Sequence, residues 1–324
     1  MTSWLLRRLG QALLVVLAMT VIVFVGMHAI GNPVDLLIGD DMNQAERAAA
    51  IARLGLDQPL WRQYLAFLEG ALRGELGKSF VYNEDAIRLI LHRLPATLEL
   101  AVAALLMAVL IGVPLGLFAG MRPEHPLSRV VMTTSIVGFS LPAFWVALML
   151  IMVFSVQLGW LPAGGRGATR ELFGVSWSWL TGDGLQHLLL PAFNLALFKI
   201  SMVLRLTRAG VREVLPLDYV KFARAKGLSP LRVMLVHVLR NTLIPLVTVL
   251  GLELGSTIAY AVVTETIFAW PGAGKLILDS INALDRPVVV AYLMVVVVIF
   301  VTLNLVVDVL YRLLDPRVRL EGAR

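Results

Sequence analysis

Long runs of apolar residues recur along the whole chain and set its predicted architecture. Each run is about as long as the roughly 20 mostly apolar residues that a membrane-crossing helix requires. The runs cover approximately residues 9–30, 97–120, 130–158, 188–204, 241–262 and 289–311. Apolar and polar residues do not alternate strictly, as they do in transmembrane barrel strands. The pattern therefore predicts an all-α integral membrane protein with six transmembrane helices.

The polar stretches between these runs divide the chain into three predicted parts. Residues 1–30 hold the N-terminus and the first helix, and residues 31–96 form a helical loop on the outer side of the membrane. Residues 97–324 contain the remaining helices and include a basic loop at residues 206–240.

Two short helices are predicted within the outer loop. Asn43 and Glu46 have the spacing of a capping box, which predicts a helix that reaches Arg53. A second helix is predicted after Pro59, where apolar residues recur at helical spacing. These residues are Trp61, Tyr64, Leu65, Leu68 and Leu72. This region is either a lid packed on the ends of the membrane helices or a surface for an external partner, and both roles are compatible.

Composition supports a membrane protein, and charge predicts its orientation. Of the 324 residues, 58% are hydrophobic and 15% are charged, which is too apolar for an ordinary soluble domain. The net charge is +6, and Lys and Arg concentrate at both termini and in residues 206–240, as expected for cytoplasmic segments. We therefore expect both termini in the cytoplasm and no nucleic acid as a partner. The chain has no cysteine, which excludes disulfides and Cys-bound zinc.

Small residues and proline predict how two of the helices pack and bend. Gly112, Gly116 and Gly120 recur at four-residue spacing in the second apolar run, which allows a neighbouring helix to approach closely. Ser140 and Pro142 predict a bend in the third run.

A basic segment at residues 218–245 is predicted to form a helix, a tight turn and a second helix. Gly227 can adopt the left-handed conformation that ends a helix. Ser229 offers an N-cap oxygen, and Pro230 suits the first position of the next helix. A compact helix-turn-helix of this kind is typical of a docking element.

Ionisable residues inside the apolar runs are candidate functional residues because they are costly in a membrane. Lys199 and Asp308 are predicted to lie at more similar depths than Lys199 and Glu253. For Lys199 we favour an ion pair, or an ammonium group that reaches the membrane interface, over contact with cargo. Glu253, with Ser256 and Thr257 one turn further on, is predicted to line a passage.

Motifs for enzymatic chemistry are absent from the sequence. Gly77-Lys78-Ser79 lacks the first glycine of a phosphate-binding loop, and Gly272 to Lys275 lacks the final Ser or Thr. No paired-histidine metal motif and no G-x-S-x-G elbow occurs. The chain is therefore predicted to be neither an enzyme nor a metal-binding protein.

Four motifs in order resemble the permease subunits of ABC importers, in the branch that carries dipeptides and oligopeptides. They lie at residues 94–100, 219–245, 264–274 and 304–317, so the resemblance covers nearly the whole chain. It implies a non-catalytic pore subunit in the bacterial inner membrane, without a cofactor of its own. It further implies as partners a second permease, two ATPases that bind ATP and Mg, and an extracytoplasmic solute-binding protein.

The resemblance also implies cargo and residue roles. Peptides are the expected cargo, with nickel chelates or glutathione as alternatives, and an ion-coupled secondary transporter is the alternative from another class. The residues expected to couple to the ATPases are Tyr219, Phe222, Ala223, Ala225, Lys226, Gly227 and Leu228. Glu265, Trp270 and Pro271 are expected either to contact the outer gate or the binding protein, or only to form a turn.

Overall fold

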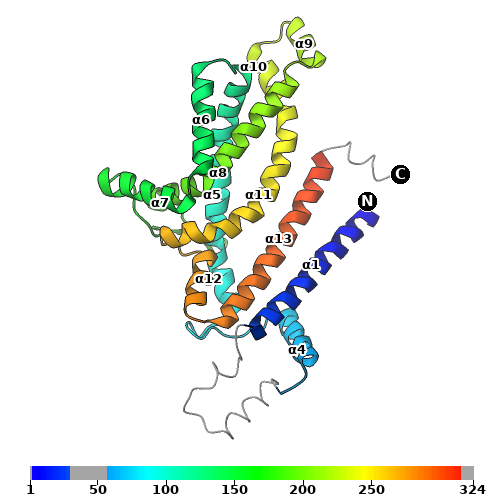
Figure 1. The fold of residues 1–324 in the computed structure, drawn as a ribbon, viewed down its shortest axis with the longest axis vertical. Coiled ribbons are helices and arrows are strands. Elements are labelled where there is room, and N and C mark those ends of the chain that lie inside the picture. Colours follow the sequence, from blue (N-terminus) through cyan, green and yellow to red (C-terminus); the bar gives the residue numbers. More distant parts are fainter. Residues whose placement is uncertain (1, 30–56, 315–324) are drawn as a thin grey trace. The chain divides into compact units, whose positions relative to one another are not determined.

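The computed structural model describes residues 2–29 and 57–314, which are mainly helical (Figure 1). They form two compact units. The first unit combines Met1–His92 with Leu276–Leu305, and the second combines Arg93–Lys275 with Val306–Arg324. The three predicted parts stay a prediction, since they divide the chain by role whereas these units divide it by packing. The predicted helix between Asn43 and Arg53 lies outside the described residues.

The first unit is built around α1 and α13. Its elements are α1 (Thr2–Ala29), α4 (Leu60–Arg73), the start of α5 (Ala86–Met121), the end of α12 (Ala273–Asn282) and most of α13 (Arg286–Leu314). The helix predicted after Pro59 is confirmed as α4, which ends at Gly74 in the left-handed conformation, with φ of 79°. Helix α4 packs on α1, where the hydroxyls of Thr20 and Tyr64 are 2.7 Å apart.

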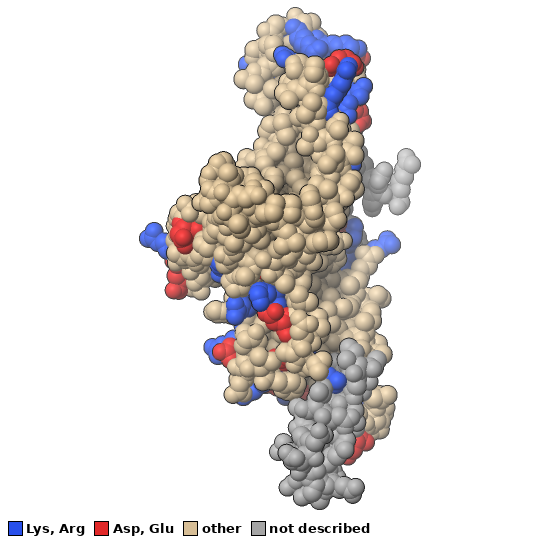
Figure 2. All heavy atoms as spheres, turned by 60° about the vertical axis from the view of Figure 1, so that its left-hand side comes forward, with Lys and Arg blue, Asp and Glu red and all other residues tan. Residues whose placement is uncertain are grey.

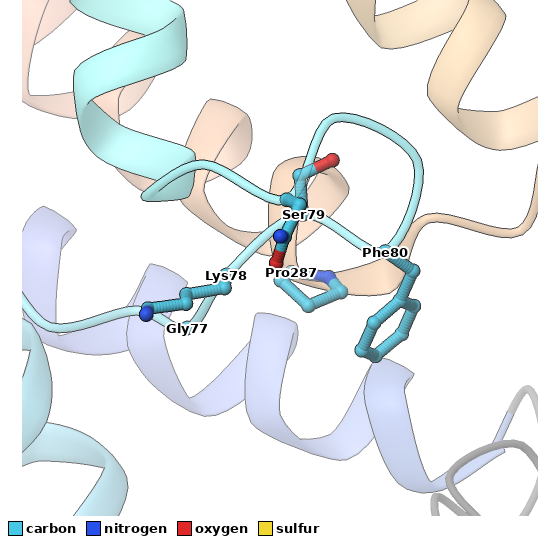
Figure 3. A pocket seen from close by; sticks show the side chains of 6 residues that line it. Gly77, Lys78, Ser79, Phe80 and Pro287 are labelled. Carbon is cyan, nitrogen blue, oxygen red and sulfur yellow. The ribbon is translucent and has the colours of Figure 1, made fainter.

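A tight loop between α4 and α5 is fixed by one buried carboxylate. Asp285 accepts hydrogen bonds from the Ser79 hydroxyl at 2.5 Å and from the Phe80 and Val81 amides at 3.2 and 3.4 Å. Figure 3 shows the hollow of about 540 Å³ beside this loop. Its lining residues are Gly77, Lys78, Ser79, Phe80, Asn83 and Pro287. The segment from Gly77 to Ser79 thus lies in a connection that follows helix α4, and not in a phosphate-binding loop after a strand.

The second unit surrounds a core formed by α5, α8 and α11. Its further elements are α6 (Pro126–Ser140), α7 (Ala143–Leu150), η1 (Ile151–Gln157), β1 (Arg170–Leu172), β2 (Val175–Trp177), α8 (Gly182–Val214), α9 (Asp218–Ala225), α10 (Pro230–Arg232), η2 (Val233–Leu239) and α11 (Arg240–Ile267). Strands β1 and β2 form a small antiparallel hairpin. Helices α5 and α8 pack so closely that a Cβ atom at Gly112 would lie 2.8 Å from Val203. At Gly116 it would lie 2.6 Å from the Leu204 carbonyl oxygen. The predicted close approach along the glycine face is confirmed.

The predicted bend near Pro142 is confirmed as a break of 108° between α6 and the helical pair α7 and η1. Within the described residues, five helices are long and apolar enough to span a membrane, or six if the bent pair forms one span. The side on which the termini lie stays a prediction.

Several helices extend beyond the apolar runs that predicted them. Helix α5 begins at Ala86 instead of residue 97, because Asp85 caps it by accepting a 3.1 Å hydrogen bond from the Arg88 amide. Pro95 consequently lies inside the helix. Helix α8 covers Gly182–Val214 rather than residues 188–204. Hydropathy identifies the apolar middle of a helix, whereas capping determines where it ends.

Candidate functional site

The turn after α9 has the hydrogen bonds of a Schellman motif. The Gly227 amide donates to the Arg224 carbonyl at 2.9 Å, and the Leu228 amide donates to the Ala223 carbonyl at 3.3 Å. Gly227 has φ of 75°, in the left-handed region. This pair of bonds closes a helix that ends on a left-handed residue. The predicted role of Gly227 as the end of the helix is confirmed.

The predicted second helix begins as expected and then takes a different form. The Ser229 hydroxyl accepts a 3.4 Å hydrogen bond from the Arg232 amide, and Pro230 occupies the first helical position. Only Pro230–Arg232 is α-helical, after which η2 forms a π-helical segment that leads into α11. Sequence patterns gave no sign of this wider coil.

Helix α9 divides its residues between the core and the surface. Val220 and Ala223 are buried against the second unit's core, so Ala223 packs internally instead of facing a partner as predicted. Phe222 is 61% exposed, and the Lys226 ammonium lies 4.6 Å from the centre of its ring. Ala225 is also exposed. Figure 2 shows Lys and Arg gathered at the end of the molecule that carries this segment.

Tyr219 ties α9 to the start of α11. Its hydroxyl accepts a 2.7 Å hydrogen bond from the Asn241 amide group and lies 3.3 Å from the His237 carbonyl oxygen. The Tyr219 side chain is 40% exposed, so it both contacts α11 and contributes to the surface. This bond and the core contacts of Val220 fasten α9 to the rest of the second unit.

A buried ion pair joins α8 to α11 in the middle of the second unit. The Lys199 ammonium donates to the Glu253 carboxylate and, at 3.2 Å, to the Ser256 hydroxyl. Lys199 is almost fully buried, whereas a quarter of the Glu253 side chain is exposed. The Thr257 hydroxyl, also buried, donates to the Glu253 carbonyl. The structure thus brings together four of the five predicted path residues.

Asp308 is the fifth predicted path residue and lies on α13. The prediction that Lys199 matches Asp308 better than Glu253 is wrong, because Lys199 pairs with Glu253. The apolar run used for the predicted depths ends at residue 204, but α8 continues to Val214. Lys199 therefore lies further from the end of its helix than the run implies. Asp308 lies half-buried in α13.

Glu265 and Trp270 lie inside the protein and organise the start of α12. The Glu265 carboxylate accepts from the Thr97 hydroxyl at 2.6 Å and from the Lys275 amide at 2.8 Å. The Trp270 indole donates to the Ala96 carbonyl at 2.9 Å. Both side chains have no exposed surface. Glu265 and Trp270 thus help to form the turn that leads from α11 into α12, and their contact with the outer gate or a binding protein stays a prediction. Pro271 is half-buried.

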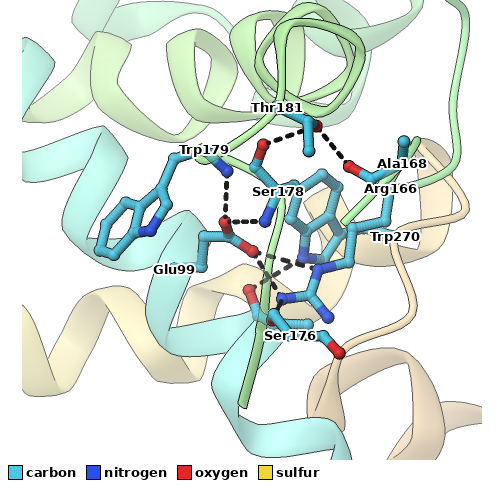
Figure 4. Close-up of polar contacts among 9 residues, drawn as sticks. Glu99, Arg166, Ala168, Ser176, Ser178, Trp179, Thr181 and Trp270 are labelled. Atoms are coloured by element: carbon cyan, nitrogen blue, oxygen red, sulfur yellow. Dashed lines mark hydrogen bonds and ion pairs between the residues drawn. The ribbon is translucent and has the colours of Figure 1, made fainter. Parts of the chain in front are cut away.

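A second buried carboxylate fixes the loop that carries β1 and β2 (Figure 4). Glu99 accepts two hydrogen bonds from Arg166, at 3.1 and 2.7 Å. Its other oxygen accepts from the Ser178 and Trp179 amides at 2.7 and 3.0 Å. One turn of α5 therefore holds both the α11–α12 turn and the β1–β2 loop, since the Ala96 carbonyl accepts from Trp270 and Glu99 accepts from Arg166. Sequence reasoning missed Arg166, because nothing local marks it as the partner of a residue 67 positions away.

Apolar helices long enough to span a membrane, with a partly exposed helix-turn-helix between two of them, define the chain as a helical integral membrane protein. A solved structure of the MetNI methionine ABC transporter contains a chain with the same fold, with a TM-score of 0.55 at 18% identity over 70% of this chain and 96% of that one. Two family models match in sequence. The N-terminal model of binding-protein-dependent transport system membrane components covers residues 1–101, and the inner membrane component model covers residues 112–320.

Full-length relatives agree with these models. The Di/tripeptide transport system permease protein DppB of Pseudomonas aeruginosa is 41% identical over 98% of this chain and 99% of its own length. The Oligopeptide transport system permease protein AppB of Bacillus subtilis is 38% identical, and the Glutathione transport system permease protein GsiC of Escherichia coli is 35% identical, each with the same coverage. The chain belongs to the family of inner membrane components of binding-protein-dependent transport systems, and it is a multi-pass inner membrane protein.

Proposed function

We propose that this chain is a permease subunit of an ABC importer for dipeptides and short oligopeptides. The observation that carries the proposal is its 41% identity, over nearly the full length of both chains, to a di/tripeptide permease. Glutathione, itself a tripeptide, is the second candidate cargo, because a glutathione permease is 35% identical over the same extent. The chain itself is proposed to perform no catalysis and to hold no cofactor.

The proposed assembly contains a second permease, two cytoplasmic ATPases that bind ATP and Mg, and an extracytoplasmic solute-binding protein. Membership of a binding-protein-dependent family supports the last of these partners. Both termini and α9 are proposed to lie in the cytoplasm, which agrees with the many basic residues in and around α9.

Helix α9 is proposed to be the lever that the ATPases move. Phe222 is the exposed apolar anchor, and Lys221, Arg224 and Lys226 form a basic rim around it. Ala225 and Gly227 allow a partner to approach closely because they have little or no side chain. The Schellman turn and the Tyr219 bond make α9 rigid relative to α11. A rigid link is what the conversion of ATPase closure into helix movement requires.

The Lys199–Glu253 pair is proposed to lie beside the translocation path. Ion pairs in the membrane are costly and usually face a polar cavity or another chain. The pair is exposed on the Glu253 side, where Ser256 adds a hydroxyl. This side offers a carboxylate to the ammonium group of a passing peptide.

Cargo competition tests the proposed substrate. The complete transporter is reconstituted in liposomes with its binding protein outside, and uptake of a radiolabelled dipeptide is measured with and without unlabelled competitors. Excess dipeptide is expected to abolish the signal, and excess glutathione to reduce it less. Uptake of labelled glutathione but not of the dipeptide would contradict dipeptides as the cargo and support glutathione instead.

A further inference from the structure

Helix α4 has two apolar faces, of which only one is covered. Tyr64 and Phe67 face α1, where the rings of Phe24 and Tyr64 meet edge to face with centroids 5.3 Å apart. A second stripe, which we call the outer stripe of α4, follows the spacing i, i+4, i+7, i+11. It consists of Trp61, Leu65, Leu68 and Leu72.

The outer stripe is largely exposed. Trp61 is 59%, Leu65 53% and Leu72 83% accessible, and Leu68 is half-buried. Charged residues lie next to it, including Arg62 and Glu69. A continuous apolar stripe with a tryptophan and with adjacent charges is typical of a helix that lies in the plane of a membrane surface.

The contacts of α4 place it at the depth where two spans end. Thr20 and Phe24, its partners on α1, fall in the last two turns of the candidate span Leu6–Gly26. Phe67 also packs against the cluster of Val23 and Val290, and Val290 lies about one turn inside the span that begins at Arg286. Ile22 and Val25 of α1 are exposed at this same level. Lipid is the expected cover for apolar side chains at this level, and α4 packs against this end of α1 (Figure 1).

The loop after α4 is a second, independent feature at the same depth. Phe80, Val81 and Tyr82 are consecutive and all exposed. Asp285, which fixes this loop, directly precedes the span that begins at Arg286. Aromatic side chains at the end of a span are typical of the membrane–water interface. The rigid loop therefore presents apolar side chains at the level of the lipid headgroups.

We propose that the outer stripe of α4 and the Phe80–Tyr82 loop insert into the boundary between lipid headgroups and acyl chains. Helix α4 and this loop thus form an interfacial anchor that fixes the end of α1 at the membrane surface. Its occupant is the phospholipid surface, because the stripe continues the lipid-covered level of α1. This role is separate from cargo and from ATP, and it does not depend on the proposed import function.

Spin labels test the anchor without a transport assay. The chain has no cysteine, so one introduced cysteine carries a nitroxide at one known position. The label is placed by Leu65→Cys or Leu72→Cys on the outer stripe and by Arg62→Cys or Glu69→Cys on the polar side. Each pair is seven residues apart and therefore shares one helix face. The chain, with the subunits that purify with it, is reconstituted in phospholipid nanodiscs.

Collision rates with oxygen, which concentrates in lipid, and with a water-soluble nickel chelate are then compared. Labels at Leu65 and Leu72 are expected to collide more with oxygen, and labels at Arg62 and Glu69 more with nickel. Equal nickel access at all four sites would place the stripe in water and overturn the proposal. Loss of access to both reagents at Leu65 and Leu72 would show a covering protein and overturn it equally. Val81→Cys, with Glu84→Cys as its control, repeats the test if an α4 variant does not fold.

Discussion

At the scale of single residues, buried polar groups join segments that lie far apart in the sequence. Glu99 and Glu265 each satisfy backbone amides of a loop or of a helix start, and Lys199 satisfies Glu253 across two helices. Buried carboxylates are stable only when such partners are present. Removal of one partner leaves a buried group unsatisfied, which costs more than the interaction contributes.

Variants of the Lys199–Glu253 pair distinguish two roles. Either Glu253 binds cargo in the translocation path, or it only pairs with Lys199 inside the protein. Glu253→Gln alone is expected to leave Lys199 buried and unpaired, at a cost of about 3–5 kcal/mol in stability. The double variant Lys199→Met with Glu253→Gln removes both charges and is expected to unfold close to the wild-type temperature. If Glu253 binds the cargo ammonium, the double variant loses peptide uptake about tenfold or more, since charged hydrogen bonds contribute about 1.5–3 kcal/mol.

The comparison that decides this point is uptake of an N-acetylated dipeptide, which has no ammonium group. The double variant is expected to import it as the wild type does. A double variant that imports free and acetylated peptides at wild-type rates would leave Lys199 and Glu253 as a packing pair only.

At the scale of elements, the turn between α9 and α10 is the feature most open to a precise test. Gly227→Pro removes the amide that donates to Arg224 and forbids a φ of 75°. We expect loss of ATPase association or of coupling, with normal membrane insertion. Gly227→Asn is the matched control, because asparagine tolerates the left-handed region, and it is expected to retain most activity. Normal transport by Gly227→Pro would refute the lever.

The α5–α8 interface gives a prediction on stability. A Cβ atom at Gly116 would lie 2.6 Å from both the Leu204 carbonyl oxygen and Thr207, so Gly116→Ala is expected to cost about 1–3 kcal/mol. Gly26→Ala on α1 is the control, since no atom lies within 4 Å of its added Cβ. Thermal unfolding in detergent should show a lower midpoint for Gly116→Ala only. Equal midpoints would mean that α5 and α8 move apart to accommodate the added methyl group without loss of stability.

Local patterns predicted elements well and long-range partners poorly. The end of α9, the N-cap at Ser229 and the helix α4 follow from a few neighbouring residues, and the structure has each of them. The pairing of Glu99 with Arg166 and of Thr97 with Glu265 depends on how loops fold onto α5, over 67 and 168 positions. No local pattern encodes such distances. The exact helix ends also depended on caps, such as Asp85, rather than on hydropathy.

At the scale of the whole molecule, the five or six apolar helices among the described residues and the family match define a membrane subunit that works with partner chains. Three of the four motifs recognised in the sequence have distinct places in this structure. Residues 94–100 hold the α11–α12 turn and the loop that carries β1 and β2, residues 219–245 include most of α9, the proposed lever, and residues 264–274 lead into α12. We therefore expect the ATPases to act on the chain through α9, and the extracytoplasmic binding protein to deliver the cargo.

The source of energy is the most direct test of the central claim. The complete transporter is reconstituted in liposomes with peptide-loaded binding protein outside, and labelled dipeptide uptake is measured with ATP inside, with ATP absent, and with an imposed proton or sodium gradient. The account predicts uptake only with internal ATP, unaffected when the gradients are collapsed. Uptake that persists without ATP and follows an ion gradient would contradict it.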